Sequence, residues 1–123
     1  SISHSRAFAA AIAAPGSVGI DIQHFVPKIE RIAHKFISDR ESGALATSTR
    51  LPHLHLFWCA KEALYKAYGR RELDFCEHIL IEPFRFDPRK REFRGWVRKG
   101  GFNRQYRLFW EQVEDYFLVY AIE

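Results

Sequence analysis

Three charged side chains have the types and spacing that could carry chemistry. Asp21 interrupts an apolar segment between Ile20 and Ile22, and an acid on a rigid strand is a good ligand for a hard cation such as Mg²⁺. The same acid could instead stand at the end of a strand, where it reaches solvent or caps a turn. Glu62 and Lys66 are four residues apart, so they share one face of a helix, where an ordinary stabilising pair is worth about 0.3 kcal/mol. A cation site and a solvated surface are therefore two open interpretations.

The helical face of Glu62 and Lys66 also carries other groups. Neither residue lies in the apolar stripe of the expected helix, and Trp58 is on their side, together with Lys61. An acid beside two lysines could hold a metal-bridged pyrophosphate, with the carboxylate on the cation and the ammonium groups on phosphate oxygens. This face is the strongest candidate for phosphate chemistry.

Other potentially reactive residues give weaker indications. Ser3 and His4 stand together near the start, but the chain has no GxSxG motif and no identifiable acid partner for a hydrolase triad. Cys59 lies among apolar residues and is expected to be a core thiol. His53 and His55 are two metal ligands without a third, which is not a site. Neither a Walker loop nor a GxGxxG motif is present, which excludes these two phosphate cradles.

The periodicity of apolar residues predicts the elements that must position these groups. The longest helix is expected over 52–68 with Gly69 as its stop, and its apolar stripe comprises Leu56, Phe57, Ala60, Ala63, Leu64 and Ala67. Shorter helices are expected to begin at Pro27 and, through a capping box, at Ser38. Strands are expected at 7–14, 18–22, 75–81, 92–97, 105–110 and 116–122. The first two strands are expected to pair, which predicts an α+β domain whose antiparallel sheet packs against a long helix.

Length and composition limit the class of protein. The 123 residues are 47% apolar, which suits a single domain over 1–123 with one core. The length and composition exclude a disordered linker, a collagen-like rod and a disulfide scaffold. No apolar run approaches the roughly 20 residues of a membrane helix, and no signal-peptide pattern is present. Cys59 and Cys76 are expected to be reduced core thiols in a cytoplasmic protein.

The net charge of +4 is concentrated in one region. Residues 85–107 hold nine Arg and Lys against Asp87 and Glu92, interleaved with aromatic residues. The expected structure is a solvated hairpin, with the aromatic side chains toward the core and the basic ones toward water. The alternative is a non-catalytic binding module that uses this region for nucleic acid or for an acidic protein. Nucleic acid is the less expected of these partners.

Three segments, taken in order, resemble the 4'-phosphopantetheinyl transferases: SISHS at 1–5, GIDI at 19–22 and FWCAKEALYKA at 57–67. Their order is similar to that of the larger, surfactin-synthetase-activating type, whose second lobe the chain resembles, with 1–14 corresponding to the end of a first lobe. The holo-acyl-carrier-protein synthase type is related and shorter. The resemblance implies an enzyme that moves the phosphopantetheine arm of coenzyme A onto a serine of an acyl or peptidyl carrier protein. Fatty acid, polyketide and nonribosomal peptide synthesis all use such carriers.

The resemblance also implies roles for individual residues. Asp21 and Glu62 would hold Mg²⁺ on the pyrophosphate of coenzyme A, and Glu62 would be the base for the incoming serine. Lys66, together with Lys61, would contact the phosphates and stabilise the leaving group. In the larger type the active site lies between two lobes, so a first lobe or a homo-oligomer would complete it.

The remaining implied contacts include one departure from the family pattern. Ser3 and His4 would contact phosphates of coenzyme A. The larger type usually has a second acid two residues after the Asp, where this chain has Gln23. Because an amide is a poorer Mg²⁺ ligand than a carboxylate, we expect either water in the metal shell or a lower metal affinity.

Overall fold

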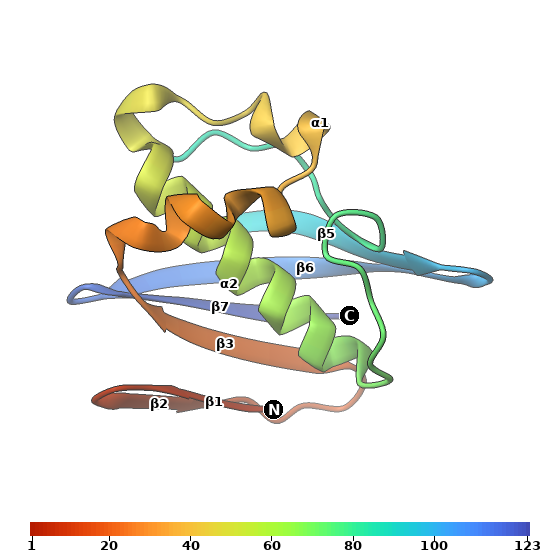
Figure 1. The fold of residues 1–123 in the computed structure, drawn as a ribbon. Helices are drawn as coiled ribbons and strands as arrows, with labels where there is room; N and C mark the ends of the chain where they lie inside the picture. The colour runs from red at the N-terminus through yellow and green to blue at the C-terminus, as the bar shows by residue number, and fades with distance from the viewer.

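A computed structural model describes all residues, 1–123. A five-stranded antiparallel sheet has the order β3-β7-β6-β5-β4, and a 19-residue helix, α2, packs on one face of it (Figure 1). The predicted α+β architecture is confirmed. The strands are β1 (Ile2–Ser5), β2 (Phe8–Ala11), β3 (Val18–His24), β4 (Ile79–Ile81), β5 (Glu92–Lys99), β6 (Phe102–Val113) and β7 (Tyr116–Ile122). The helical elements are η1 (Pro27–Lys35), α1 (Asp39–Ser42), η2 (Thr47–Thr49) and α2 (Arg50–Tyr68). None of them combines the length and apolar character needed to cross a bilayer.

The main sheet joins the two ends of the chain. β3 pairs with the last strand, β7, and places Asp21 opposite Val119. The expected pairing of 7–14 with 18–22 was wrong, because β2 pairs with β1 in a separate hairpin that lies beside β3 (Figure 1). Alternation indicates which side chains share a face, but it does not indicate which strand lies alongside, so tertiary packing decided the partner.

Local signals predicted the helix ends in the middle of the chain. Ser38 and Glu41 form the expected capping box at the start of α1, where each side chain accepts a hydrogen bond from the other residue's backbone N–H. α2 ends before Gly69, whose φ of 72° is left-handed. The helix predicted at Pro27 is present but is the tighter 3-10 form.

The strand expected over 75–81 is shorter than predicted, since β4 begins only at Ile79. Before it lies a turn held by Asp74, whose Oδ1 accepts hydrogen bonds of 2.8 Å from the backbone N–H groups of Cys76 and Glu77. An aspartate that binds the backbone two and three residues further on stabilises a turn in place of a strand.

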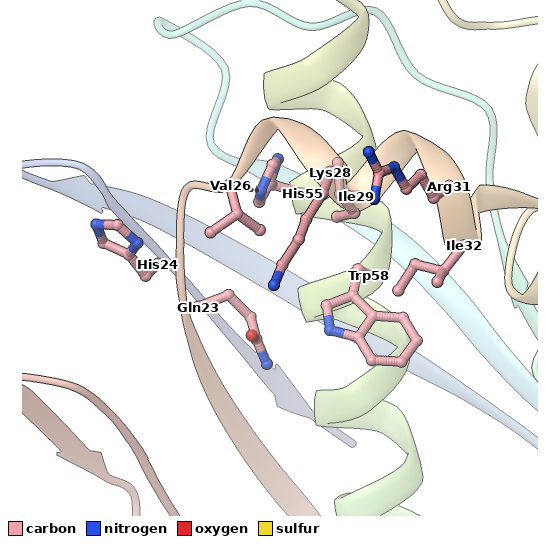
Figure 2. Close-up of a pocket in the computed structure, with 9 residues that line it drawn as sticks. All are labelled: Gln23, His24, Val26, Lys28, Ile29, Arg31, Ile32, His55 and Trp58. Carbon is pink, nitrogen blue, oxygen red and sulfur yellow. Dashed lines mark hydrogen bonds between the residues drawn. The ribbon is translucent and has the colours of Figure 1, made fainter.

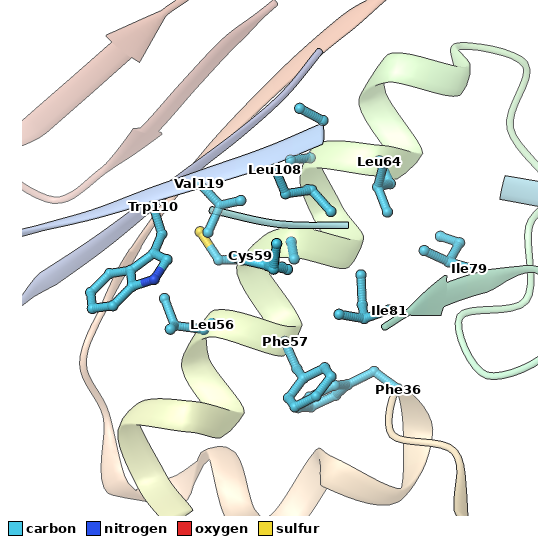
Figure 3. Close-up of a cluster of buried hydrophobic side chains, with 14 of the residues drawn as sticks. Phe36, Leu56, Phe57, Cys59, Leu64, Ile79, Ile81, Leu108, Trp110 and Val119 are labelled. Atoms are coloured by element: carbon cyan, nitrogen blue, oxygen red, sulfur yellow. The ribbon is translucent and has the colours of Figure 1, made fainter. Parts of the chain in front are cut away.

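The contact between α2 and β3 depends on one glycine. A Cβ on Gly19 would lie 1.9 Å from the carbonyl oxygen of Ala63 in α2, so only glycine fits at this crossing. On either side of the crossing, α2 packs into the core through Leu56, Phe57 and Leu64, which are fully buried, as the apolar stripe predicted (Figure 3). β3 is thereby held against the helix. Asp21, two residues after Gly19 on the same side of β3, faces α2.

Residues 92–107 of the basic region lie in the hairpin of β5 and β6, which turns at Gly100 with φ of 58°, and residues 85–91 lie in the loop before β5. The side chains of the hairpin alternate as expected: Phe93 is buried, while Arg94 is exposed and stands opposite the exposed Arg107. Trp96 departs from the expectation, since it lies half-buried on the exposed face beside Arg94.

Candidate active site

Asp21 is a buried acid, not one that reaches solvent. Its residue exposure is 3%, and its carboxylate accepts three hydrogen bonds. Oδ1 accepts from the Ser3 hydroxyl at 3.1 Å and from the Lys66 ammonium at 3.1 Å, and Oδ2 accepts from the Gln23 amide at 2.8 Å. The interpretation as a solvated end-of-strand acid is therefore wrong. Burial with three donors is the pattern of a carboxylate held in one orientation.

β1 and Ser1, the residue before it, close the free edge of β3 through serine hydroxyls. Ser1 Oγ accepts from the backbone N–H of Ile20 at 3.2 Å, and Ser3 Oγ accepts from that of Ile22 at 3.1 Å. Unpaired strand amides need such partners when they are buried. Ser3 therefore links the backbone of β3 to the Asp21 carboxylate, a contact that the sequence did not indicate.

Lys66 points to Asp21 and not to Glu62. Besides the Asp21 carboxylate, its ammonium reaches the carbonyl oxygens of Ile20 at 3.1 Å and Ile2 at 3.4 Å. No ion pair joins Glu62 and Lys66, so the ordinary surface pair that their spacing allowed is not formed. An ammonium has three donors, and all three have acceptors here, of which the Ile2 carbonyl is the most distant.

Glu62 stands half-buried, one helical turn from Lys66, and its carboxylate has no hydrogen-bond partner. The pKa of Glu62 is raised to about 7: burial is the largest cause, the negative charge of Asp21 adds to it, and the positive charge of Lys66 acts in the opposite direction. The structure thus brings Asp21, Glu62 and Lys66 together, and it leaves one carboxylate able to take up a proton or a cation near neutral pH.

Lys61 lies elsewhere, which corrects the expectation that it contacts phosphates beside Glu62. Its side chain is completely buried, with the ammonium 2.7 Å from Oε1 of Glu41 and 2.6 Å from the carbonyl oxygen of Phe75. Burial lowers the pKa of Lys61, and the Glu41 carboxylate opposes this effect. The sequence did contain the signal: Lys61 is four residues after Phe57 and three before Leu64, which places it on the apolar face.

Glu41 is the residue that sequence reasoning assigned only to helix capping. In addition to Lys61, its carboxylate accepts from the backbone N–H of Ser38 at 3.0 Å and from that of Ile81 at 2.8 Å. One buried carboxylate therefore ties α1, α2 and β4 together. Nothing in a capping-box motif distinguishes this acid from one that faces solvent.

The remaining candidates are kept apart from the cluster. His4 is exposed, on the opposite side of β1 from Ser3. His55 accepts a hydrogen bond from the backbone N–H of Val26 at 2.9 Å, whereas neither ring nitrogen of the buried His53 has a partner. Burial raises the pKa of the Cys59 thiol well above its usual value, so this thiol is not a nucleophile.

A pocket of about 260 Å³ opens beside the cluster, between η1 and α2 (Figure 2). Gln23, which is hydrogen-bonded to Asp21, lines it together with Trp58. Lys28 and Arg31 of η1 add two positive charges to the lining. The pocket therefore adjoins the carboxylates through Gln23 and is suited to an anionic or amphipathic ligand.

The family model described as the 4'-phosphopantetheinyl transferase superfamily matches residues 17–121. The chain therefore belongs to this superfamily, whose members transfer phosphopantetheine from coenzyme A to carrier proteins and use Mg²⁺. The β1–β2 hairpin precedes the matched range. No curated protein matches the chain.

The carboxylate oxygens in the cluster fit a magnesium ion. Mg²⁺ prefers oxygen ligands and is commonly held by one or two carboxylates, with water and substrate phosphates in the other positions. Asp21 and Glu62 supply two carboxylates close enough for one to raise the pKa of the other. No group of three or more His, Cys, Asp or Glu side chains is arranged as a complete metal site. The protein thus offers two ligands of the right kind.

Proposed function

We propose that this chain transfers the 4'-phosphopantetheine group of coenzyme A to a serine of an apo carrier protein, with Mg²⁺ as the cofactor. Membership of the superfamily supports the reaction class. The observation that carries the proposal is the Glu62 carboxylate, which is half-buried, without a hydrogen bond, and beside a second acid and an ammonium.

Glu62 is the base in this proposal. The hydroxyl oxygen of the acceptor serine attacks the phosphorus that bears pantetheine, and the serine proton passes to the Glu62 carboxylate, directly or through a water. Such a base needs a carboxylate oxygen that is free to accept the proton, and the Glu62 carboxylate has no hydrogen-bond partner within the chain. The new bond joins the serine oxygen to phosphorus, and the bond that breaks joins this phosphorus to the bridging oxygen of the pyrophosphate.

Lys66 stabilises the leaving group, 3',5'-ADP, on whose phosphate the negative charge develops. To reach that oxygen the ammonium exchanges its longest contact, the 3.4 Å hydrogen bond to the carbonyl oxygen of Ile2. The contact to Asp21 remains and holds the ammonium in place. Ser3 acts by fixing Asp21, and His4, on the exposed side of β1, is the proposed contact for a phosphate of coenzyme A.

Asp21 and Glu62 would hold the magnesium ion, which when bound neutralises the negative charge of the pyrophosphate. Asp21 suits this role because three donors fix its carboxylate in one orientation. Glu62 suits it because no other group occupies its oxygens. The two acids come from β3 and α2, which the crossing at Gly19 holds together.

The test is a mass measurement on the acceptor. The chain, coenzyme A, Mg²⁺ and an apo carrier protein should give a carrier heavier by one phosphopantetheine. Fatty acid, polyketide and peptide carriers should each be tried, because the acceptor is a separate question. The Glu62→Gln variant should be inactive, while Glu111→Gln, the same change at an exposed residue of β6, should react as the wild type does. No transfer to any carrier and no binding of coenzyme A would refute the proposal.

A further inference from the structure

Gln23 holds Asp21 by its nitrogen and not by its oxygen. The amide nitrogen lies 2.8 Å from Oδ2 of Asp21, and an ionised carboxylate can only accept hydrogen bonds. The amide oxygen of Gln23 is therefore directed away from that carboxylate, at the rim of the pocket that Trp58 also lines (Figure 2). Gln23 stands two residues after Asp21, where an acid would be a third metal ligand beside Asp21 and Glu62. It donates a hydrogen bond to Asp21 instead.

Because Gln23 is neutral, it leaves the cluster with little net charge. The ammonium of Lys66, 3.1 Å from Asp21 Oδ1, balances one of the two carboxylates. Asp21, Glu62 and Lys66 then sum to a single negative charge, and Gln23 adds none. A lone divalent cation is held weakly by such a set, since it keeps most of its water and lacks further anionic ligands. A diphosphate supplies the missing anionic oxygens.

We infer that Gln23 is a positioning residue that makes cation binding depend on the diphosphate, so that the cation binds together with the diphosphate of the coenzyme and not before it. This inference rests on the proposed function. Gln23 does so in two ways: it orients Asp21 through the 2.8 Å hydrogen bond, and it keeps the cluster short of the third carboxylate that would trap a cation alone.

The experiment uses Mn²⁺ as the probe, either alone or as a preformed equimolar complex with inorganic pyrophosphate. Paramagnetic broadening of the backbone amide signals of residues 19–22 counts only the Mn²⁺ bound at this cluster. The wild type should bind the complex about tenfold more tightly than Mn²⁺ alone. Gln23→Glu should bind Mn²⁺ alone about tenfold more tightly than the wild type does, because a third carboxylate joins the site, and the difference between the two probes should shrink.

Two further variants separate positioning from charge and from general effects. Gln23→Leu keeps the size and removes the donor, so it should bind the Mn²⁺–pyrophosphate complex about tenfold more weakly, as expected when a partner that orients a metal ligand is lost. Its melting temperature without metal should fall by only a few degrees, because Ser3 and Lys66 still bind Asp21. Gln105→Glu makes the same charge change on the exposed face of β6 and should titrate as the wild type does.

Each outcome decides the inference. Equal binding of Mn²⁺ with and without pyrophosphate by the wild type, or equal titrations of Gln23→Glu and Gln105→Glu, would overturn it, and so would the absence of Mn²⁺ at residues 19–22. If pyrophosphate strengthens Mn²⁺ binding as expected and no carrier is modified, the proposed function fails and the inference stands. If carriers are modified and pyrophosphate does not strengthen Mn²⁺ binding, the inference alone fails.

Discussion

Lys61 and Lys66 lie just over one turn apart on α2, and each pairs with a carboxylate, yet the two pairs have different environments. Lys61 and Glu41 are completely buried, at 2.7 Å, with backbone groups around both charges. Lys66 and Asp21 are 3.1 Å apart, and about a third of the lysine side chain is exposed. The first pair is closed to any ligand. The second has an open side and a neighbouring acid, Glu62, with no partner of its own.

The difference shows what makes an ion pair available for chemistry. A buried pair whose remaining donors and acceptors are satisfied holds elements together, and its charges cannot reorganise without leaving one of them uncompensated. A pair at the edge of the core can exchange one contact for a ligand, because water and substrate can replace what is lost. Lys61 therefore belongs to the architecture of α1, α2 and β4, and Lys66 belongs to the site.

The largest expected effect comes from breaking the closed pair. Lys61→Met leaves the Glu41 carboxylate buried without its counter-charge, which should lower the free energy of unfolding by about 3–5 kcal/mol. Urea unfolding followed by circular dichroism measures this change. The double variant Lys61→Met, Glu41→Gln should recover about half of the loss, because no charge is then left unpaired. A single variant as stable as the wild type would contradict the assignment of Lys61 to the core.

A second prediction concerns His53, a buried residue of the same helix with no partner at all. Its ring lies 4.9 Å from that of Phe57 and 4.6 Å from that of Phe84, and burial lowers the pKa of His53 to about 4. Between its unfolded value near 6.5 and this folded value, the unfolded chain binds more protons, so stability falls as the pH falls. From pH 7 to pH 4 this histidine should cost about 3 kcal/mol of stability.

Comparison with His53→Phe isolates this contribution, since a phenyl ring keeps the stacking and does not titrate. The free energies of unfolding of the two proteins, measured by urea at several pH values, should diverge as the pH falls below about 6.5. Parallel curves would show that the buried ring does not titrate as inferred, whatever the absolute stabilities are.

A third and smaller effect is expected at the open pair. Lys66→Met should lower the rate of phosphopantetheine transfer about 100-fold, the size of effect found when one donor to a developing negative charge is removed. Its free energy of unfolding should fall by only about 1–2 kcal/mol, less than for Lys61→Met, because Ser3 and Gln23 still bind Asp21. Lys90→Met, at an exposed lysine, is the matched control. Equal stability losses in the Lys61 and Lys66 variants would remove the contrast between the two pairs.

The parts of the fold that the sequence predicted correctly depend on short-range signals. The capping box at Ser38, the glycine stop at Gly69 and the alternation in β6 and β7 each involve residues within a few positions of one another. The pairing of β3 with β7 joins segments about one hundred residues apart, and no local pattern encodes such a partner. The β1 strand was not predicted because its serines and histidine do not alternate with apolar residues.

The candidate site divides in the same way. Asp21, Glu62 and Lys66 were identified from residue type and spacing, and the structure brings them together. Spacing places Lys61 on the apolar side of the helix, but no local pattern identifies Glu41, twenty residues earlier, as its partner. The contact of Ser3 to Asp21 required the position of β1 beside β3, and that of Lys66 required the position of α2. Gln23 is two residues after Asp21 on the same strand, so this contact is a local one.

The sequence by itself determined the class of fold, the helix that carries Glu62 and Lys66, the strand that carries Asp21, and the family to which the chain belongs. The tertiary structure alone decided which carboxylate each lysine meets, Glu41 for Lys61 and Asp21 for Lys66. The physical reason lies at the crossing of β3 and α2: the absence of a side chain at Gly19 sets the distance between them. Burial then separates two ion pairs of the same chemistry into one that stabilises the fold and one that faces a ligand.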